Sequence, residues 1–144
     1  MRILVQRSAS ASVTVSNHIV GEIDFGLVLL VGFTNDDDFA KIDYMVNKIL
    51  NLRIFPDENN IMNKSVLDVR GSILSISQFT LYGDCRKGNR PSYIKALSSD
   101  KARLLYDEFN KRMSAYINVE TGAFGENMNV NINNVGPTTI WLER

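Results

Sequence analysis

The hydrophobic pattern along the chain predicts a protein made mostly of β-strands. Two short β-rich stretches come first, Arg2–Arg7 and Ser12–Val15, and Ser16-Asn17 then offers a two-residue turn into a hairpin strand at His18–Ile23. The run Leu27–Phe33 is continuously apolar, which is typical of a strand buried on both faces.

Strand patterns return in the second half of the chain. Ser72–Leu81 alternates and then becomes apolar, which predicts a central strand. Three shorter strands are expected near Ile117–Thr121, Met128–Ile132 and Thr138–Leu142.

Two helices are expected among these strands. Asn35 and the run Asp36–Asp38 open the first one, because short acidic side chains accept hydrogen bonds from the free N–H groups at a helix start. A metal site at the acidic run is the alternative, but no second acidic cluster supports it. The core face of this helix is predicted at Phe39, Ile42, Met45 or Val46, Ile49 and Leu52.

The second helix is predicted to begin at Ser98-Ser99-Asp100. Its inward face is expected at Ala102, Leu105, Phe109 and Met113. Many strands with two separate helices, without regular β-α-β alternation, indicate an α+β fold in which mainly antiparallel β-sheets form a sandwich or partial barrel with two helices. We expect the 144 residues to form a single domain, 1–144.

Composition narrows the possible functions. The net charge is zero, so any RNA contact would depend on a local basic patch. One cysteine and one histidine exclude an internal disulfide and provide too few ligands for a zinc site. The N-terminal segment is too short and polar for a signal peptide, and no apolar run approaches the roughly 20 residues of a membrane span. These observations predict a cytoplasmic protein without metal or membrane contact.

The single histidine and the single cysteine are weak catalytic candidates. A Ser-His-Asp or Cys-His arrangement would need His18, which follows a hairpin turn and is expected to be exposed. Cys85 lies beside Arg86 and Lys87, whose charges would lower its thiol pKa, yet a non-catalytic thiol is the simpler interpretation.

Three other segments carry candidate chemistry. Ser77–Leu81 places hydroxyls, an amide and successive backbone N–H groups at the end of a core strand, where they could form an oxyanion hole or simply be satisfied within the sheet. Asn134–Thr139 contains Gly136-Pro137, which usually marks an ordinary turn. Arg86–Lys95 carries four positive charges and is the best candidate for phosphate contacts.

Ser77–Leu81 and Asn134–Thr139 resemble the two signature motifs of the D-aminoacyl-tRNA deacylase family. Other segments fit this family in order and spacing: Met1–Arg7, Asn51–Phe55, Met62–Val66, Arg86–Ser92 and Val119–Gly125. The resemblance covers essentially the whole chain. Thr138 and Cys85 are small departures from the family pattern.

The resemblance implies a hydrolase that cleaves the ester between a D-amino acid and the 3′-terminal adenosine of tRNA without a cofactor. It also implies a homodimer with active sites at the subunit interface. The implied catalytic residues are Ser77, Gln78, Phe79 and Thr80 of one subunit, and Gly136 and Pro137 of the other select chirality. Arg7 resembles the residue that hydrogen-bonds the Gly-Pro motif, and Arg86, Lys87 and Arg90 are the expected tRNA contacts.

A proofreader of handedness should hold the α-amino group and Cα with rigid backbone groups, because a shaped pocket discriminates by size. A cis Gly136–Pro137 bond would direct two carbonyl oxygens into the space that an L side chain needs, although only ~5–6% of X-Pro bonds are cis. Glycyl-tRNA should also be hydrolysed. Water assisted by the ribose 2′-OH is the favoured attacking group, with Thr80 positioning it or acting as nucleophile. The alternatives are a non-catalytic tRNA-binding module and a cysteine hydrolase using Cys85.

Overall fold

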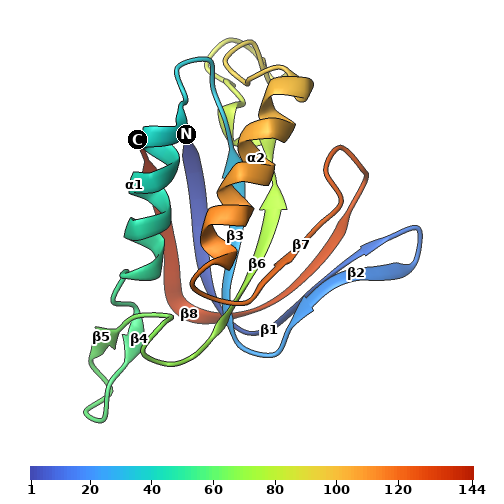
Figure 1. The fold of residues 1–144 in the computed structure, drawn as a ribbon. Coiled ribbons are helices and arrows are strands. Elements are labelled where there is room, and N and C mark those ends of the chain that lie inside the picture. The colour runs from blue at the N-terminus through green and yellow to red at the C-terminus, as the bar shows by residue number, and fades with distance from the viewer.

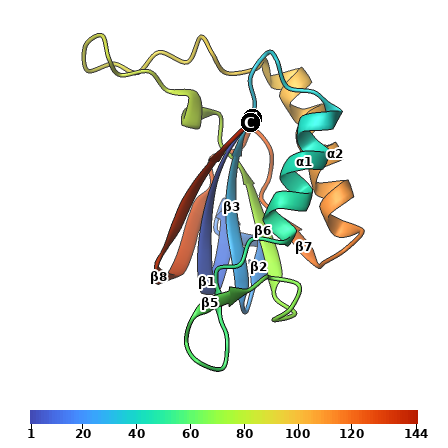
Figure 2. The same cartoon turned by 90° about the vertical axis from the view of Figure 1, so that its left-hand side faces the viewer.

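The computed structural model describes residues 1–144 as a six-stranded sheet with two helices packed on one face (Figures 1 and 2). The strands are β1 (Arg2–Val15), β2 (His18–Ile23), β3 (Gly26–Gly32), β6 (Ser72–Ser77), β7 (Val119–Thr121) and β8 (Asn129–Glu143), with β4 (Phe55–Pro56) and β5 (Met62–Lys64) forming a separate small pair. The helices are α1 (Phe39–Leu50) and α2 (Ser99–Ser114), and a 3-10 turn, η1 (Phe79–Tyr82), follows β6.

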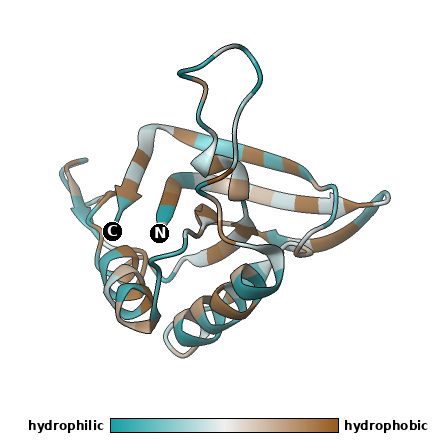
Figure 3. Ribbon diagram, turned by 90° about the horizontal axis from the view of Figure 1, so that it is seen from above, coloured by the Kyte–Doolittle hydropathy of each residue, from teal (hydrophilic) through white to brown (hydrophobic).

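The large sheet has the order β2-β1-β3-β6-β7, and β8 pairs with the other edge of β1. Because β2 also lies against β7, the sheet curls into a nearly closed, barrel-like form. Figure 3 shows hydrophilic and hydrophobic residues alternating along these strands. The two helices and the barrel-like sheet were predicted from the sequence.

The sheet is mixed, which corrects the expectation of mainly antiparallel strands. β1 pairs antiparallel with β2, β3 and β8, but β3 pairs parallel with β6, and β6 pairs parallel with β7. The reason is that α1 lies between β3 and β6, and α2 lies between β6 and β7. Each helix returns the chain to the same end of the sheet, so that the next strand runs parallel.

Two pairs of predicted short strands are each one long strand. β1 joins Arg2–Arg7 to Ser12–Val15, and β8 joins Met128–Ile132 to Thr138–Leu142. The first half of β1 pairs with β3 and the second half with β2, while β8 follows β1 along both halves with two shifts in register. These shifts let the long pair bend without losing its partner.

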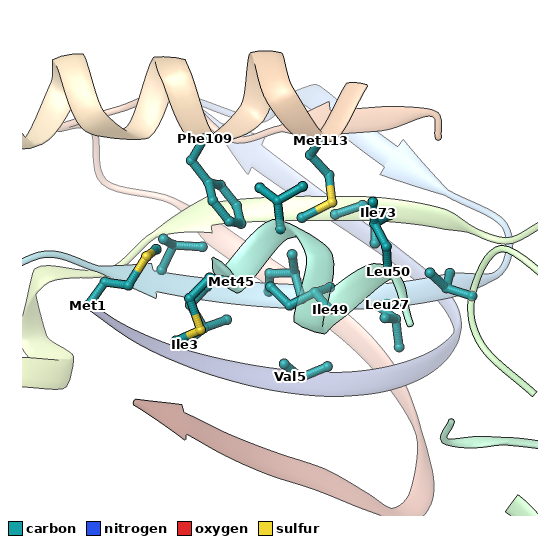
Figure 4. Close-up of a cluster of buried hydrophobic side chains, with 14 of the residues drawn as sticks. Met1, Ile3, Val5, Leu27, Met45, Ile49, Leu50, Ile73, Phe109 and Met113 are labelled. Carbon is teal, nitrogen blue, oxygen red and sulfur yellow. The ribbon is translucent and has the colours of Figure 1, made fainter. Parts of the chain in front are cut away.

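The main core lies between the helices and the sheet (Figure 4). Phe109 and Met113 of α2 point there toward side chains of α1 and the strands. β3 is buried on both faces, as predicted, because Leu27 and Leu29 enter this core while Val28 enters a second, smaller one inside the curl of the sheet.

The helix starts were largely predicted. Asp38 caps α1 by accepting a hydrogen bond from the Lys41 backbone N–H at 2.8 Å, which confirms the capping interpretation of the acidic run. Phe39 was wrongly assigned to the core: it is 55% exposed because α1 begins there, before the buried stripe starts.

Two further positions on the helices differ from the prediction. Leu52 lies beyond the end of α1 and is half-buried against the core, and on α2 Tyr106 is buried beside the half-buried Leu105. Ser98 precedes α2 without a side-chain capping bond. Neither helix is long and apolar enough to cross a membrane.

Candidate functional site

A pocket of about 550 Å³ opens where the ends of β3 and β6 meet the start of α2 and the connection between β7 and β8. Ser77, Gln78 and Phe79 form one of its walls, and Phe124–Met128 form another. Glu126 is the only charged residue of the lining, so the pocket carries a negative charge that suits a cationic group.

The sequence predicted that the strand continues through the motif Ser77–Leu81, but the structure ends it at Ser77. β6 ends at Ser77, the Gln78 backbone N–H still donates to the Val31 carbonyl at 2.7 Å, and η1 then carries the chain out of the sheet. Thr80 is exposed beside the pocket, and its hydroxyl accepts a hydrogen bond from the Gln78 side-chain amide. Strand and turn together therefore bring the four predicted catalytic residues to one place.

Two backbone N–H groups at this turn have no hydrogen-bond partner. The bonds of η1 begin with the N–H of Leu81, which donates to the Gln78 carbonyl at 3.3 Å. The N–H groups of Phe79 and Thr80 precede that bond and stay free, as do the first donors of any helical turn. Consecutive free donors of this kind can bind an oxyanion.

The second motif lies in a wide irregularity of β8. Between the pairs Gln6–Thr139 and Ser8–Asn134, β8 has three more residues than β1, so Gly136 and Pro137 project from the sheet. Both are exposed, and the peptide bond between them is cis, as predicted. A Cβ built on Gly136 would meet no atom within 4 Å, so the space in front of it is open.

The side chain of Arg7 lies under this motif and hydrogen-bonds to it. The residue is only 8% exposed, so its side chain is buried under the motif and does not lie on the surface. Its guanidinium donates to the Gly136 carbonyl at 3.3 Å and to the Ile54 carbonyl at 2.7 Å. The hydrogen bond predicted between Arg7 and the Gly-Pro segment is therefore present.

One subunit does not bring the two motifs together. The Gln78 N–H bonds to Val31 of β3, which pairs with Ile3 of β1, whereas the Gly136 carbonyl accepts a hydrogen bond from Arg7. From Ile3 to Arg7 the strand advances about 13 Å, at the rise of an extended strand. Neither Gly136 nor Pro137 lines the pocket.

The predicted RNA contacts lie on an exposed loop after η1. Arg86 forms an ion pair with Asp84 at 2.5 Å, and this guanidinium holds the pKa of the Asp84 carboxyl well below its usual range. Lys87 and Arg90 are exposed without ion-pair partners. Cys85 on the same loop and His18 on the β1–β2 hairpin are also exposed.

The wall Phe124–Met128 was not assigned to the site from the sequence. Two glycines in the sequence could have indicated this segment. Gly125 has φ +84°, and a Cβ on Gly122 would lie 2.5 Å from the Met128 sulfur. One glycine adopts a left-handed conformation and the other leaves no room for a side chain, so the backbone of this segment is tightly constrained. No group of three His, Cys, Asp or Glu side chains is arranged to hold a metal ion.

Comparison with known proteins gives this geometry a context. A family model described as D-Tyr-tRNA(Tyr) deacylase matches residues 4–143. The chain belongs to this deacylase family. Curated proteins named D-aminoacyl-tRNA deacylase from Bacillus cytotoxicus and Anoxybacillus flavithermus are 55% and 54% identical to it over 144 residues, 99% of each chain.

Solved structures also match the deacylase chain. A structure called c-Myc DNA Unwinding Element Binding Protein has a TM-score of 0.94 and 39% identity, covering 100% of this chain and 99% of the other. A probable eukaryotic D-amino acid tRNA deacylase shares the fold, with a TM-score of 0.84 at 18% identity over 98% and 97% of the two chains. The protein is thus a hydrolase of the ester bond in D-aminoacyl-tRNA, and aminoacylated tRNA is its substrate.

Proposed function

We propose that the pocket beside Ser77, Gln78, Phe79 and Thr80 is the active site and that Gly136 and Pro137 of a second subunit complete it. The observation that carries this proposal is the separation of the two motifs, about 13 Å along β1 within one chain. Gly136 and Pro137 project into open space, where a partner subunit can receive them. A homodimer with two-fold symmetry forms two such sites from one pair of surfaces.

Hydrolysis in this site needs little covalent chemistry from the protein. A water molecule attacks the ester carbonyl carbon, assisted by the ribose 2′-OH, and the bond to the 3′ oxygen breaks. The free N–H groups of Phe79 and Thr80 stabilise the negative oxygen of the tetrahedral intermediate, each contributing roughly 3–4 kcal/mol if well placed. The 3′ oxygen takes up a proton, and free tRNA and the D-amino acid leave.

Chirality is selected by backbone groups. The carbonyl oxygens of Gly136 and Pro137 occupy the space of an L side chain, and a hydrogen bond from Arg7, which is itself anchored on the Ile54 carbonyl, holds the Gly136 carbonyl in place. The D side chain points outward and meets no pocket that would select it by size, so many D-amino acids are accepted. Glycine has no side chain to exclude, and mischarged glycyl-tRNA is therefore also a substrate.

The tRNA backbone is held by the basic loop after η1. Arg86, Lys87 and Arg90 lie there, and the chain has no net charge to attract RNA over a longer range. Lys87 and Arg90 contribute more than Arg86, because Asp84 already neutralises the Arg86 guanidinium.

Mixing two inactive variants tests the shared site. One variant, Phe79→Pro, removes one of the two free N–H groups, and the other, Gly136→Ala with Pro137→Ala, damages the projecting motif. A mixed dimer then has one site built from two intact motifs, so random mixing should restore about a quarter of wild-type D-tyrosyl-tRNA hydrolysis. No recovery, in a sample where tagged mixed dimers are detected, would show that each site lies within one subunit.

A further inference from the structure

The carbonyl of Ser75 joins three elements behind the pocket. The hydroxyl of Tyr106, on α2, donates to this oxygen at 2.7 Å, and the Gly122 backbone N–H donates to it at 3.0 Å. Ser75 lies in β6 two residues before Ser77, and Gly122 opens the segment that carries Phe124. One acceptor therefore connects α2 to both of the pocket walls named above.

The hydroxyl of Tyr106 is a buried donor. Tyr106 is 3% exposed and Ser75 is fully buried. Burial raises the pKa of Tyr106 above its usual value. The phenol thus keeps its proton and donates it to the Ser75 carbonyl, two residues before the catalytic motif begins at Ser77.

The ring of Tyr106 also supports the other wall. It packs against Phe124 with ring centroids 5.7 Å apart at an angle of 45°. From the same helix, the Arg103 guanidinium lies 5.0 Å from the centre of the Phe124 ring and donates to the Phe124 carbonyl at 3.2 Å. α2 therefore sets the distance between the Phe124 wall and the end of β6.

We propose that Tyr106 is a positioning residue for deacylation: its buried hydroxyl fixes the end of β6 against α2 and the Gly122–Met128 segment, and so holds the free N–H groups of Phe79 and Thr80 in place. The proposal rests on the assignment of this pocket as the active site. A phenylalanine would fill the same space in the core, so the hydroxyl itself is what specifies this arrangement.

Tyr106→Phe tests the role, because it removes one oxygen and leaves the ring on Phe124. Loss of an oxyanion donor lowers kcat by about 10²–10³-fold, and displacement of donors should remove part of that effect. We expect kcat for D-tyrosyl-tRNA to fall about tenfold, while KM changes less than about twofold and hydrolysis of the L ester stays undetectable.

A stability-matched control separates positioning from weakened packing. Ile49→Val removes one methylene from the main core without touching Ser75, and it should lower the unfolding midpoint while leaving kcat unchanged. Tyr116→Phe changes an exposed hydroxyl and should alter neither quantity. A kcat within twofold of wild type in Tyr106→Phe, or an equal loss in Ile49→Val, would overturn the proposal.

A second variant covers the case in which Tyr106→Phe does not fold. Arg103→Met, which loosens Phe124 from the helix surface, should lower kcat about threefold at unchanged stability, and an unaltered kcat would count against the role of α2. Recovery of activity on mixing subunits does not depend on Tyr106, so failure of this proposal is distinguishable from failure of the shared site.

Discussion

Arg7 shows how one side chain can connect the core to the functional surface. Its guanidinium spans the Ile54 and Gly136 carbonyls, while its Nε atom is buried without a partner. A planar guanidinium can donate to both carbonyls at once, whereas a lysine ammonium on its flexible side chain fixes two acceptors less well. The side chain is therefore suited to holding Gly136 in a fixed direction.

Arg7→Met should loosen that arrangement. Two carbonyls lose their charged donor, and we expect the free energy of unfolding to fall by about 1–3 kcal/mol. The ratio of D-tyrosyl-tRNA to L-tyrosyl-tRNA hydrolysis should fall as well, measured under single-turnover conditions. Gln6→Met is the neighbouring control, because the Gln6 side chain bonds only to the exposed Thr139 side chain. Unchanged stereoselectivity in a destabilised Arg7→Met protein would separate Arg7 from chiral selection.

The loss of kcat in Thr80 variants distinguishes a positioning role of this side chain from a nucleophilic one. If Thr80 positions groups through its bond with Gln78, Thr80→Val should lose about 0.5–1.5 kcal/mol of transition-state stabilisation, or roughly two- to tenfold in kcat. Thr80→Ser should keep nearly full activity, and handedness should be unaltered in both. A loss above about 10³-fold in Thr80→Val would instead identify Thr80 as the nucleophile.

At the scale of elements, the irregular connections carry the chemistry and the regular ones position it. η1 ends a buried strand and exposes two N–H groups, and the extra residues of β8 project Gly136 and Pro137. The loop after η1 carries exposed basic side chains. Each segment depends on the rigid strand or helix beside it for its direction.

The basic loop predicts a defined salt dependence. Replacing Arg86, Lys87 and Arg90 with glutamine should weaken tRNA binding and reduce the slope of log K against log salt by about 0.7–0.9 for each phosphate that the protein no longer neutralises. The expected reduction corresponds more nearly to two phosphates than to three, because Arg86 is already paired with Asp84. Lys48→Gln with Lys111→Gln, on the two helices, is the control and should leave the slope unchanged. An unaltered slope in the loop variant would place the RNA surface elsewhere.

At the scale of the whole molecule, two buried tyrosines couple stability to alkaline pH. Burial raises the pKa of both Tyr82 and Tyr106. Above about pH 10 the unfolded chain ionises its tyrosines while the native protein keeps these two protons. The native state then binds more protons than the unfolded state, so the free energy of unfolding should fall as pH rises.

Urea unfolding between about pH 9 and 11, on either side of the ordinary tyrosine pKa, measures this fall. Tyr82→Phe with Tyr106→Phe should flatten the pH dependence, because both buried phenols are removed. Tyr44→Phe with Tyr116→Phe changes two exposed phenols and should leave the dependence as it is. A wild-type stability that stays constant over this range would contradict the role assigned to burial.

The sequence by itself determined the local features of the protein. Apolar periodicity located both helices and the six strands of the large sheet but not β4 and β5, Asp38 identified the start of α1, and the motifs Ser77–Leu81 and Asn134–Thr139 indicated the family. These features depend on residues close together in the chain, whose side-chain spacing and capping bonds are set locally.

Only the tertiary structure decided how those pieces meet. Which strands are parallel followed from where α1 and α2 cross the sheet, and the continuity of β1 and β8 followed from shared pairing along both halves. The wall Phe124–Met128 reached the pocket, and Tyr106 rather than Leu105 became the buried residue that meets Ser75, through packing between distant segments. Such contacts depend on the joint geometry of several elements, and no local pattern specifies that geometry.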